Sequence, residues 1–227
     1  MAQLLEQNLK ENSFYARGVY LVKMKAGVME EGRDFTGKAA ELMECMVDAG
    51  ALTQTAAALA LRCNRQEAGR AAKSLWFAGM MDIYNVLSQN ASSTTNAQFQ
   101  LWVIKGCQAP ADAREACRLA ILGLFYGHAK IEMPGFGWRL VRRHGWPVMA
   151  EVGFANKDGE VVKWLVDAPR MDEEPVPEAD LVIYHDPEDA DQKTPAGKRY
   201  VWDLAVVGAR PDELRKAVKL KKILQPA

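Results

Sequence analysis

Net charge is the first property that this sequence lacks. The 227 residues include 29 Lys and Arg and 29 Asp and Glu, so the formal net charge is zero. A protein that coats nucleic acid through its overall charge needs an excess of basic residues, so this balance excludes a polybasic, histone-like protein. A local basic patch is still compatible with the composition, because segregated charges also sum to zero.

Cysteine pairs and long apolar runs are also missing. Cys45, Cys63, Cys107 and Cys117 are scattered without a CxxC pair, which argues against a disulfide framework or a structural zinc site and is typical of a reducing compartment. The longest apolar run, residues 119–126, is far shorter than the roughly 20 residues of a membrane-spanning helix. The start of the chain lacks the apolar core of a secretory signal. We therefore predict a cytoplasmic protein with no membrane partner.

The residues that are present are those of a folded protein. Hydrophobic residues make up 49% and charged residues 26% of the chain, close to the averages of soluble globular proteins. The pattern predicts an N-terminal arm (residues 1–34) and two domains (residues 35–107 and 108–227). The arm contains a mixed apolar and basic run over residues 15–25, whose apolar side chains need a surface to cover them. We expect the arm to pack on the next domain or on a second copy of the chain.

Residues 35–107 carry the most informative pattern. Apolar residues recur at i, i+3, i+4, i+7 and i+8 over residues 39–47, which predicts an amphipathic helix. A short Ala-rich helix is expected over residues 53–61. Asn64 and Glu67 then form a capping-box pattern, in which each side chain bonds to the other residue's backbone amide at the start of a third helix. Three helices with such tight links predict a helix-turn-helix.

Two strand-like runs follow the third helix. Residues 81–87 and 99–104 are rich in β-branched and aromatic side chains, and residues 88–98 between them are mostly small and polar. They predict a β-hairpin with a long exposed tip. Three helices followed by a hairpin resemble the winged helix-turn-helix family. The resemblance implies that the third helix enters the major groove of DNA and that the hairpin is the wing.

The third helix therefore supplies the candidate DNA contacts. An apolar stripe on this helix predicts an outward face made of Arg65, Gln66, Gly69, Arg70 and Lys73. In a winged helix, Arg reads guanine, Gln reads adenine, and either basic side chain holds phosphate. Gly69 would let the helix approach the groove wall closely. The same residue types also occur on an ordinary solvated helix face, which is the alternative interpretation.

The wing is less favourable for DNA binding. Ser93 and Thr94 at its tip can donate to phosphate oxygens, but the tip carries no Lys or Arg. Residues 1–107 contain 11 Lys and Arg against 10 Asp and Glu, and a net charge of +1 predicts weak binding of double-stranded DNA by one copy. We therefore expect a homodimer or a DNA-processing partner protein. A winged helix that binds protein instead of DNA is the alternative.

Residues 108–227 combine helical and strand-like patterns and predict a mixed α+β domain, so the expected fold class is α+β for the whole chain. A helix is expected over residues 112–126, a solvated loop over residues 186–198 and a basic helix over residues 211–222. Strands are expected over residues 138–142, 148–154, 161–166, 181–184 and 200–207. Arg139, Arg142, Arg143 and His144 form a basic cluster beside aromatic residues, which suits single-stranded nucleic acid or an exposed strand face.

Acidic residues are associated with two of these strands. Asp180 enters the strand over residues 181–184, and Asp203 interrupts the next one. This arrangement resembles the PD-(D/E)xK nuclease core, in which such a pair holds a divalent metal. Ala205 stands where that family has its Lys, which implies a degenerate core that does not cut. We therefore predict no catalytic residue and no cofactor, with Mg²⁺ held by Asp180, Asp203 and Glu151 as the alternative.

The order of these two domains resembles the replication-relaxation family of plasmid and conjugative-element proteins. The resemblance covers most of residues 35–222 and depends on the element order together with Asp180 and Asp203. It implies a DNA-binding regulator, or an accessory factor in plasmid replication or transfer. Two alternatives stay open: a metal-dependent nuclease and a non-enzymatic protein-interaction module.

Overall fold

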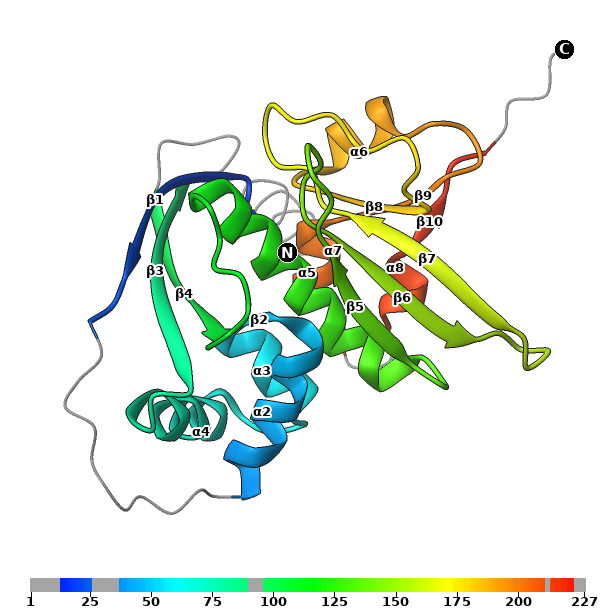
Figure 1. Ribbon diagram of the computed structural model, residues 1–227. Helices are drawn as coiled ribbons and strands as arrows, with labels where there is room; N and C mark the ends of the chain where they lie inside the picture. The colour runs from blue at the N-terminus through cyan, green and yellow to red at the C-terminus, as the bar shows by residue number, and fades with distance from the viewer. Residues whose placement is uncertain (1–12, 26–36, 90–95, 211–212, 223–227) are drawn as a thin grey trace, which may run out of the picture.

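A mixed α+β fold is seen in the computed structural model, which describes residues 13–25, 37–89, 96–210 and 213–222 (Figure 1). The described strands form a four-stranded sheet and a six-stranded sheet, with helices packed between and around them. The fold class expected from the sequence is confirmed at this level.

The N-terminal half contains the three helices and the hairpin that the sequence pattern predicts. In chain order its elements are α2 (Gly37–Ala49), β2 (Ala51–Thr53), α3 (Gln54–Ala60), α4 (Arg65–Phe77), β3 (Met81–Gln89) and β4 (Asn96–Ile104). The Thr53 side chain accepts a hydrogen bond from the Ala56 amide at 3.3 Å and so begins α3. Strands β3 and β4 pair in register over nine residues each.

The described part of the arm is built into the first sheet. Strand β1 (Arg17–Lys23) pairs antiparallel with β3, and the sheet order is β1-β3-β4-β2. This segment therefore packs on its own chain, which is the first of the two expected alternatives. Residues 1–12 and 26–34 of the arm lie outside the described residues.

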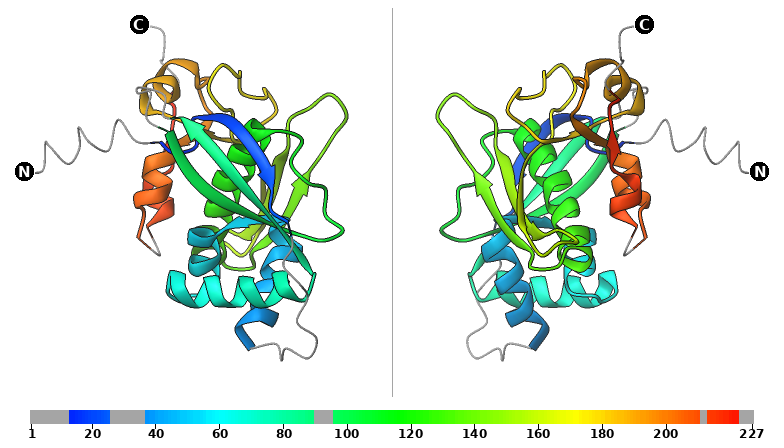
Figure 2. Two further views of the ribbon diagram at one scale, coloured as in Figure 1. Left: turned by 90° about the vertical axis from the view of Figure 1, so that its left-hand side faces the viewer. Right: turned by 90° about the vertical axis from the view of Figure 1, so that its right-hand side faces the viewer.

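Helix α5 (Ala113–Glu132) lies between the two sheets (Figures 1 and 2). Its N-cap, Asp112, accepts from the Glu115 amide at 2.8 Å. Almost every side chain from Ala113 to Ala129 is buried, including those of Arg118 and His128, because the helix is enclosed between the two sheets. A Cβ atom on Gly127 would lie 2.9 Å from the Ala56 carbonyl oxygen, so glycine lets α5 pack closely against α3.

The second sheet has the order β10-β9-β8-β7-β6-β5. Its strands are β5 (Gly137–Val141), β6 (Met149–Ala155), β7 (Val161–Asp167), β8 (Leu181–Tyr184), β9 (Arg199–Trp202) and β10 (Lys219–Leu220). Strands β5, β6 and β7 form an antiparallel meander, whereas β7, β8 and β9 are parallel. The carboxyl ends of these three parallel strands therefore lie at one edge of the sheet.

Three predictions for the C-terminal half are wrong. The expected loop over residues 186–198 contains α6 (Pro187–Lys193), which Asp186 caps. The expected strand over residues 200–207 ends at Trp202, because β8 ends opposite it at Tyr184; the chain continues as α7 (Asp203–Gly208). The expected C-terminal helix is reduced to α8 (Leu214–Ala217), because Lys219 and Leu220 pair with β9 as β10.

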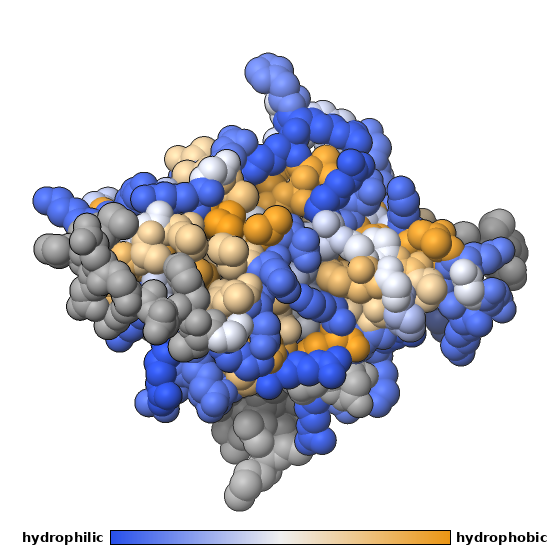
Figure 3. Space-filling view, turned by 60° about the horizontal axis from the view of Figure 1, so that its bottom comes forward, coloured by the Kyte–Doolittle hydropathy of each residue, from blue (hydrophilic) through white to orange (hydrophobic). Residues whose placement is uncertain are grey.

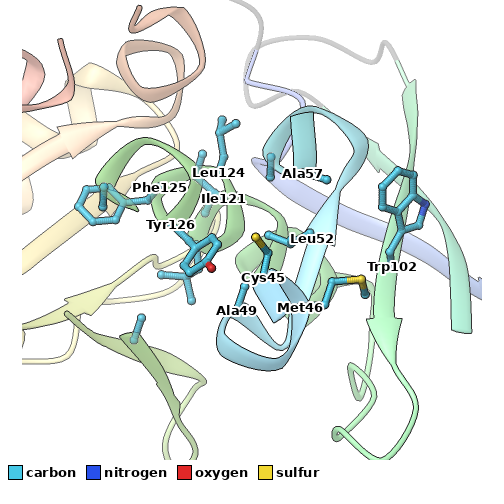
Figure 4. Close-up of a cluster of buried hydrophobic side chains, with 14 of the residues drawn as sticks. Cys45, Met46, Ala49, Leu52, Ala57, Trp102, Ile121, Leu124, Phe125 and Tyr126 are labelled. Atoms are coloured by element: carbon cyan, nitrogen blue, oxygen red, sulfur yellow. The ribbon is translucent and has the colours of Figure 1, made fainter. Parts of the chain in front are cut away.

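One hydrophobic cluster joins the two halves of the chain. Figure 4 shows side chains from α2, β2 and α3 lying between Trp102 of β4 and Ile121, Leu124, Phe125 and Tyr126 of α5. The same cluster continues into β6, β8 and β9. The described residues thus share a core across the expected boundary at residues 107 and 108, and α5 belongs to both sides of it.

Candidate nucleic-acid interface

Helix α4 is held in a fixed orientation by its first turn and its buried stripe. The Asn64 side chain accepts from the Glu67 amide at 2.9 Å, and the Glu67 carboxylate accepts from the Asn64 amide at 3.3 Å. The predicted capping box is therefore confirmed. The predicted inward stripe is also buried, and it consists of Ala68, Ala71, Ala72 and Leu75. These contacts determine which side of α4 faces outward.

The outward face of α4 carries cations without acidic partners. Arg65, Gln66, Arg70 and Lys73 are all exposed, as the helical period predicts. Within the part of the chain that the structure describes, none of the three basic side chains forms an ion pair. A guanidinium or ammonium group that has no carboxylate partner is free to contact phosphate or a base edge.

Gly69 does not belong to this outward face, which corrects the sequence interpretation. A Cβ atom at this position would lie 2.8 Å from Nε2 of Gln54 on α3. That Gln54 amide donates to the Arg65 carbonyl oxygen at 2.7 Å and ties the start of α4 to α3. Gly69 therefore makes room for a contact within the chain rather than for the approach of DNA.

A groove of about 880 Å³ lies beside the first turn of α4. Its lining residues are Thr55, Ala58, Leu59, Arg62, Cys63, Asn64, Arg65, Glu67 and Ile131. Figure 3 views the molecule with its lower end turned forward and shows hydrophobic patches interspersed with hydrophilic residues on that face. Arg62, which is exposed and has φ 49°, adds a fourth cation next to Arg65.

The hairpin that follows α4 extends away from it. Nine residues at about 3.3 Å each give β3 a length of about 30 Å, and Figure 1 shows α4 at the foot of the strands. Ser93 and Thr94, the candidate contacts at the tip, lie outside the described residues. Their role stays a prediction from the sequence.

Asp203 occupies a buried ion pair, not an open metal site. It is fully buried, and its carboxylate receives hydrogen bonds from Arg170 at 2.7 and 3.3 Å and from the Ser13 hydroxyl. The other Arg170 donors bond to the carbonyl oxygens of Ala168, Tyr15 and Ile183 at 3.0 to 3.1 Å. All five guanidinium N–H groups are therefore used within the protein.

A second buried pair lies at the same edge of the sheet. Arg118 of α5 pairs with Asp167, the last residue of β7, and with Glu173 at 2.5 Å. Asp167 also accepts from the amides of Ala168 and Val176 at 2.7 and 2.8 Å. We call the two pairs with their partners the buried ion network. The sequence does not indicate this network, because the paired residues lie far apart in the chain.

The three acidic metal candidates do not converge. Asp180 precedes β8 and Asp203 follows β9, and because these strands are parallel the two residues lie at opposite ends, roughly 15 Å apart. The Asp180 carboxylate accepts from the Leu165 amide at 2.8 Å. Glu151 lies on β6 beside Arg139 at 2.8 Å, and that hydrogen bond lowers the pKa of its carboxyl group. These three residues therefore do not form the shared Mg²⁺ site that the sequence offers as the alternative.

One other group of side chains within the described ranges has the spacing of metal ligands. His185 Nε2 lies 2.8 Å from Asp186 Oδ2 and 3.7 Å from Asp189 Oδ2, at the start of α6. The Asp189 carboxylate is already paired with Lys193 at 2.9 Å. In the sequence, the signal for this group is the close spacing of His185, Asp186 and Asp189, three residue types that bind metal ions.

Two of the four residues of the basic cluster near β5 are paired with acidic residues. Arg142 pairs with Glu115, and Arg139 pairs with Glu151. Arg143 lies over the Trp146 ring, 5.5 Å from its centroid, beside a cavity of about 450 Å³. Fewer free cations are therefore gathered here than on α4.

No described helix is both long and apolar enough to cross a lipid bilayer. Comparisons of the chain with models of protein families, with curated proteins and with solved structures found no match.

Proposed function

We propose that this chain is a winged-helix protein that binds double-stranded DNA through the outward face of α4. The observation that carries the proposal is the set of three exposed, unpaired cations, Arg65, Arg70 and Lys73, on a helix whose orientation is fixed by a capping box and a buried stripe. The element order α2-β2-α3-α4-β3-β4 also supports this proposal, because a β-hairpin directly follows α4, as it follows the DNA-binding helix of a winged helix.

The biological role that we propose is a regulator, or an accessory factor in the replication or transfer of a plasmid or conjugative element. One copy offers few cations to phosphate, so binding as a homodimer or beside a DNA-processing protein is part of the proposal. A nuclease is not favoured, because Asp180, Asp203 and Glu151 lie apart and Asp203 is saturated by Arg170 and Ser13.

The direct test replaces the three cations together. We expect the Arg65/Arg70/Lys73→Ala protein to lose most of its duplex affinity in fluorescence anisotropy at low salt. Arg70→Ala alone is expected to cost about 1–3 kcal/mol of binding free energy if the Arg70 guanidinium donates two hydrogen bonds to one guanine. The slope of log affinity against log salt should also become shallower by about 0.9 for each phosphate contact removed.

The matched control removes the same charge elsewhere. Lys157, Lys163 and Arg215 are exposed residues in the C-terminal half, and their triple alanine variant should bind duplex as the parent does. Equal affinity in both triple variants and the parent, or no salt-dependent binding by any of them, would refute DNA binding and favour the protein-interaction alternative. Duplexes from plasmid replication and transfer origins, compared with random duplexes of equal length, test the biological role.

A further inference from the structure

Strand register divides the first sheet into two faces. Tyr84, Val86, Leu101 and Val103 belong to the cluster that covers α5, whereas Met81, Ile83 and Trp102 belong to the cluster that includes α2 and α4. Because side chains alternate along a strand, residues spaced by two from Ile83 and Trp102 share the face on which α4 packs. No described helix covers the far part of that face (Figure 1).

The uncovered part begins with two rows of three residues across neighbouring strands. One row is Val22, Asn85 and Gln100, and the next is Tyr20, Leu87 and Gln98. We call these six residues the amide face. Tyr20 is 58% and Val22 41% exposed, and Gln98 and Gln100 are exposed as well. The first row lies one step, about 7 Å, from Ile83 and Trp102 beneath the helices.

The amide face has no charged side chain and several hydrogen-bond donors. Gln100 Nε2 lies 3.4 Å from Asn85 Oδ1, which orders two of the amides across the strands. Asn, Gln and Tyr are among the side chains that donate hydrogen bonds to phosphate and sugar oxygens. An acidic residue on this surface would repel the phosphates, and the amide face has none. The amide face begins one row beyond Ile83 and Trp102, which pack in the same cluster as the buried stripe of α4. The proposed function assigns the opposite, outward side of that helix to the major groove.

We propose that the amide face is a second DNA-contact surface, over which the sugar–phosphate backbone of the duplex bound by α4 passes. This inference rests on the proposed function. In this arrangement the body of the sheet makes the phosphate contacts that position the duplex. The sequence of the hairpin tip has no Lys or Arg for such contacts. A second copy of the chain is the competing occupant, but an interface core is typically dominated by apolar and aromatic side chains, whereas half of these six are amides.

The test adds charge of each sign to the amide face. Val22→Lys places a cation beside the expected phosphates and should tighten duplex binding several-fold while steepening its salt dependence. Val161→Lys is the control, because Val161 is a 75% exposed valine on β7 in the other half. The double variant Gln98→Glu/Gln100→Glu should weaken binding by about tenfold through repulsion, whereas Gln108→Glu/Gln192→Glu should leave it unchanged.

The outcomes separate this inference from the proposed function. If the α4 triple variant loses binding but Val22→Lys behaves like Val161→Lys, the amide face makes no DNA contact and the proposed function stands. If the α4 triple variant binds as the parent does, the proposed function fails on its own evidence. If light scattering shows a dimer that Val22→Lys converts to a monomer with weaker DNA binding, the amide face is an interface between copies and the inference is overturned.

Discussion

The outward face of α4 and the buried ion network contain similar charged side chains under opposite conditions. Arg65 and Arg70 are exposed and have no carboxylate partner among the described residues, whereas Arg118 and Arg170 are buried and paired with carboxylates. A buried charge is tolerated only when partners replace its hydration, so the network uses its charges to hold the fold. An exposed cation keeps its capacity to bind something else. Arginine therefore indicates a binding site here only where the structure leaves it unpaired.

The largest expected effect comes from removing one charge of the buried ion network. Asp203→Asn keeps the shape of the side chain but leaves the Arg170 guanidinium buried without its counter-charge. We expect the free energy of unfolding to fall by about 3–5 kcal/mol in urea denaturation. Arg65→Ala on α4 should change it by no more than about 0.5 kcal/mol. Similar small losses in both variants would contradict the division between the two regions.

A smaller effect is expected where the orientation of α4 is fixed. Asn64→Ala removes the side chain that accepts from the Glu67 amide, and losing such an N-cap costs about 0.5–2 kcal/mol. Thermal unfolding of Asn64→Ala and of Asn64→Ser measures this, because Ser is an equally good cap. A stable Asn64→Ala protein with the parent's melting temperature would show that packing alone holds the helix.

The smallest effect on stability concerns a buried titratable side chain on α5, the helix shared by the two halves of the chain. His128 on α5 is 1% exposed, and burial lowers the pKa of its imidazole below 6.5, an effect that nearby Glu132 partly offsets. The unfolded chain therefore binds this proton first as the pH falls through 6.5. Unfolding should become easier below that pH, until the pH reaches the pKa of the folded state.

Replacing His128 tests this pH dependence. Between pH 7.5 and 5.5, the free energy of unfolding of His128→Gln should depend less on pH than that of the parent. His144→Gln, at an exposed position, should keep the parent's dependence. An identical pH dependence in both variants would mean that other groups cause the acid sensitivity.

The parts predicted correctly from the sequence are those governed by local rules. The capping box of Asn64 and Glu67 and the outward position of Arg65, Arg70 and Lys73 follow from spacing within one helix, and spacing is visible in the sequence. Gly69 was misplaced because the partner that explains it, Gln54, lies on another helix.

The parts that the sequence did not reveal depend on strand pairing. Residues 200–207 have strand-like composition throughout, but only the first part finds a neighbour in β8, so Asp203 begins a helix instead of interrupting a strand. The separation of Asp180 and Asp203, two of the candidate metal ligands, has the same origin. Whether two acids meet depends on whether their strands run parallel or antiparallel, and composition does not encode that direction.

The bond between Ser13 and Asp203 has a consequence for synthesis of the chain. The two residues are 190 positions apart, so at 5–20 residues per second a ribosome completes the second about 10–40 s after the first. Strand β1 and β3 are both made long before then and can pair early. The hydrogen bond of Ser13 must wait for residues near the carboxyl end, so a chain arrested before residue 203 can pair β1 with β3 but lacks this last contact of the amino-terminal segment.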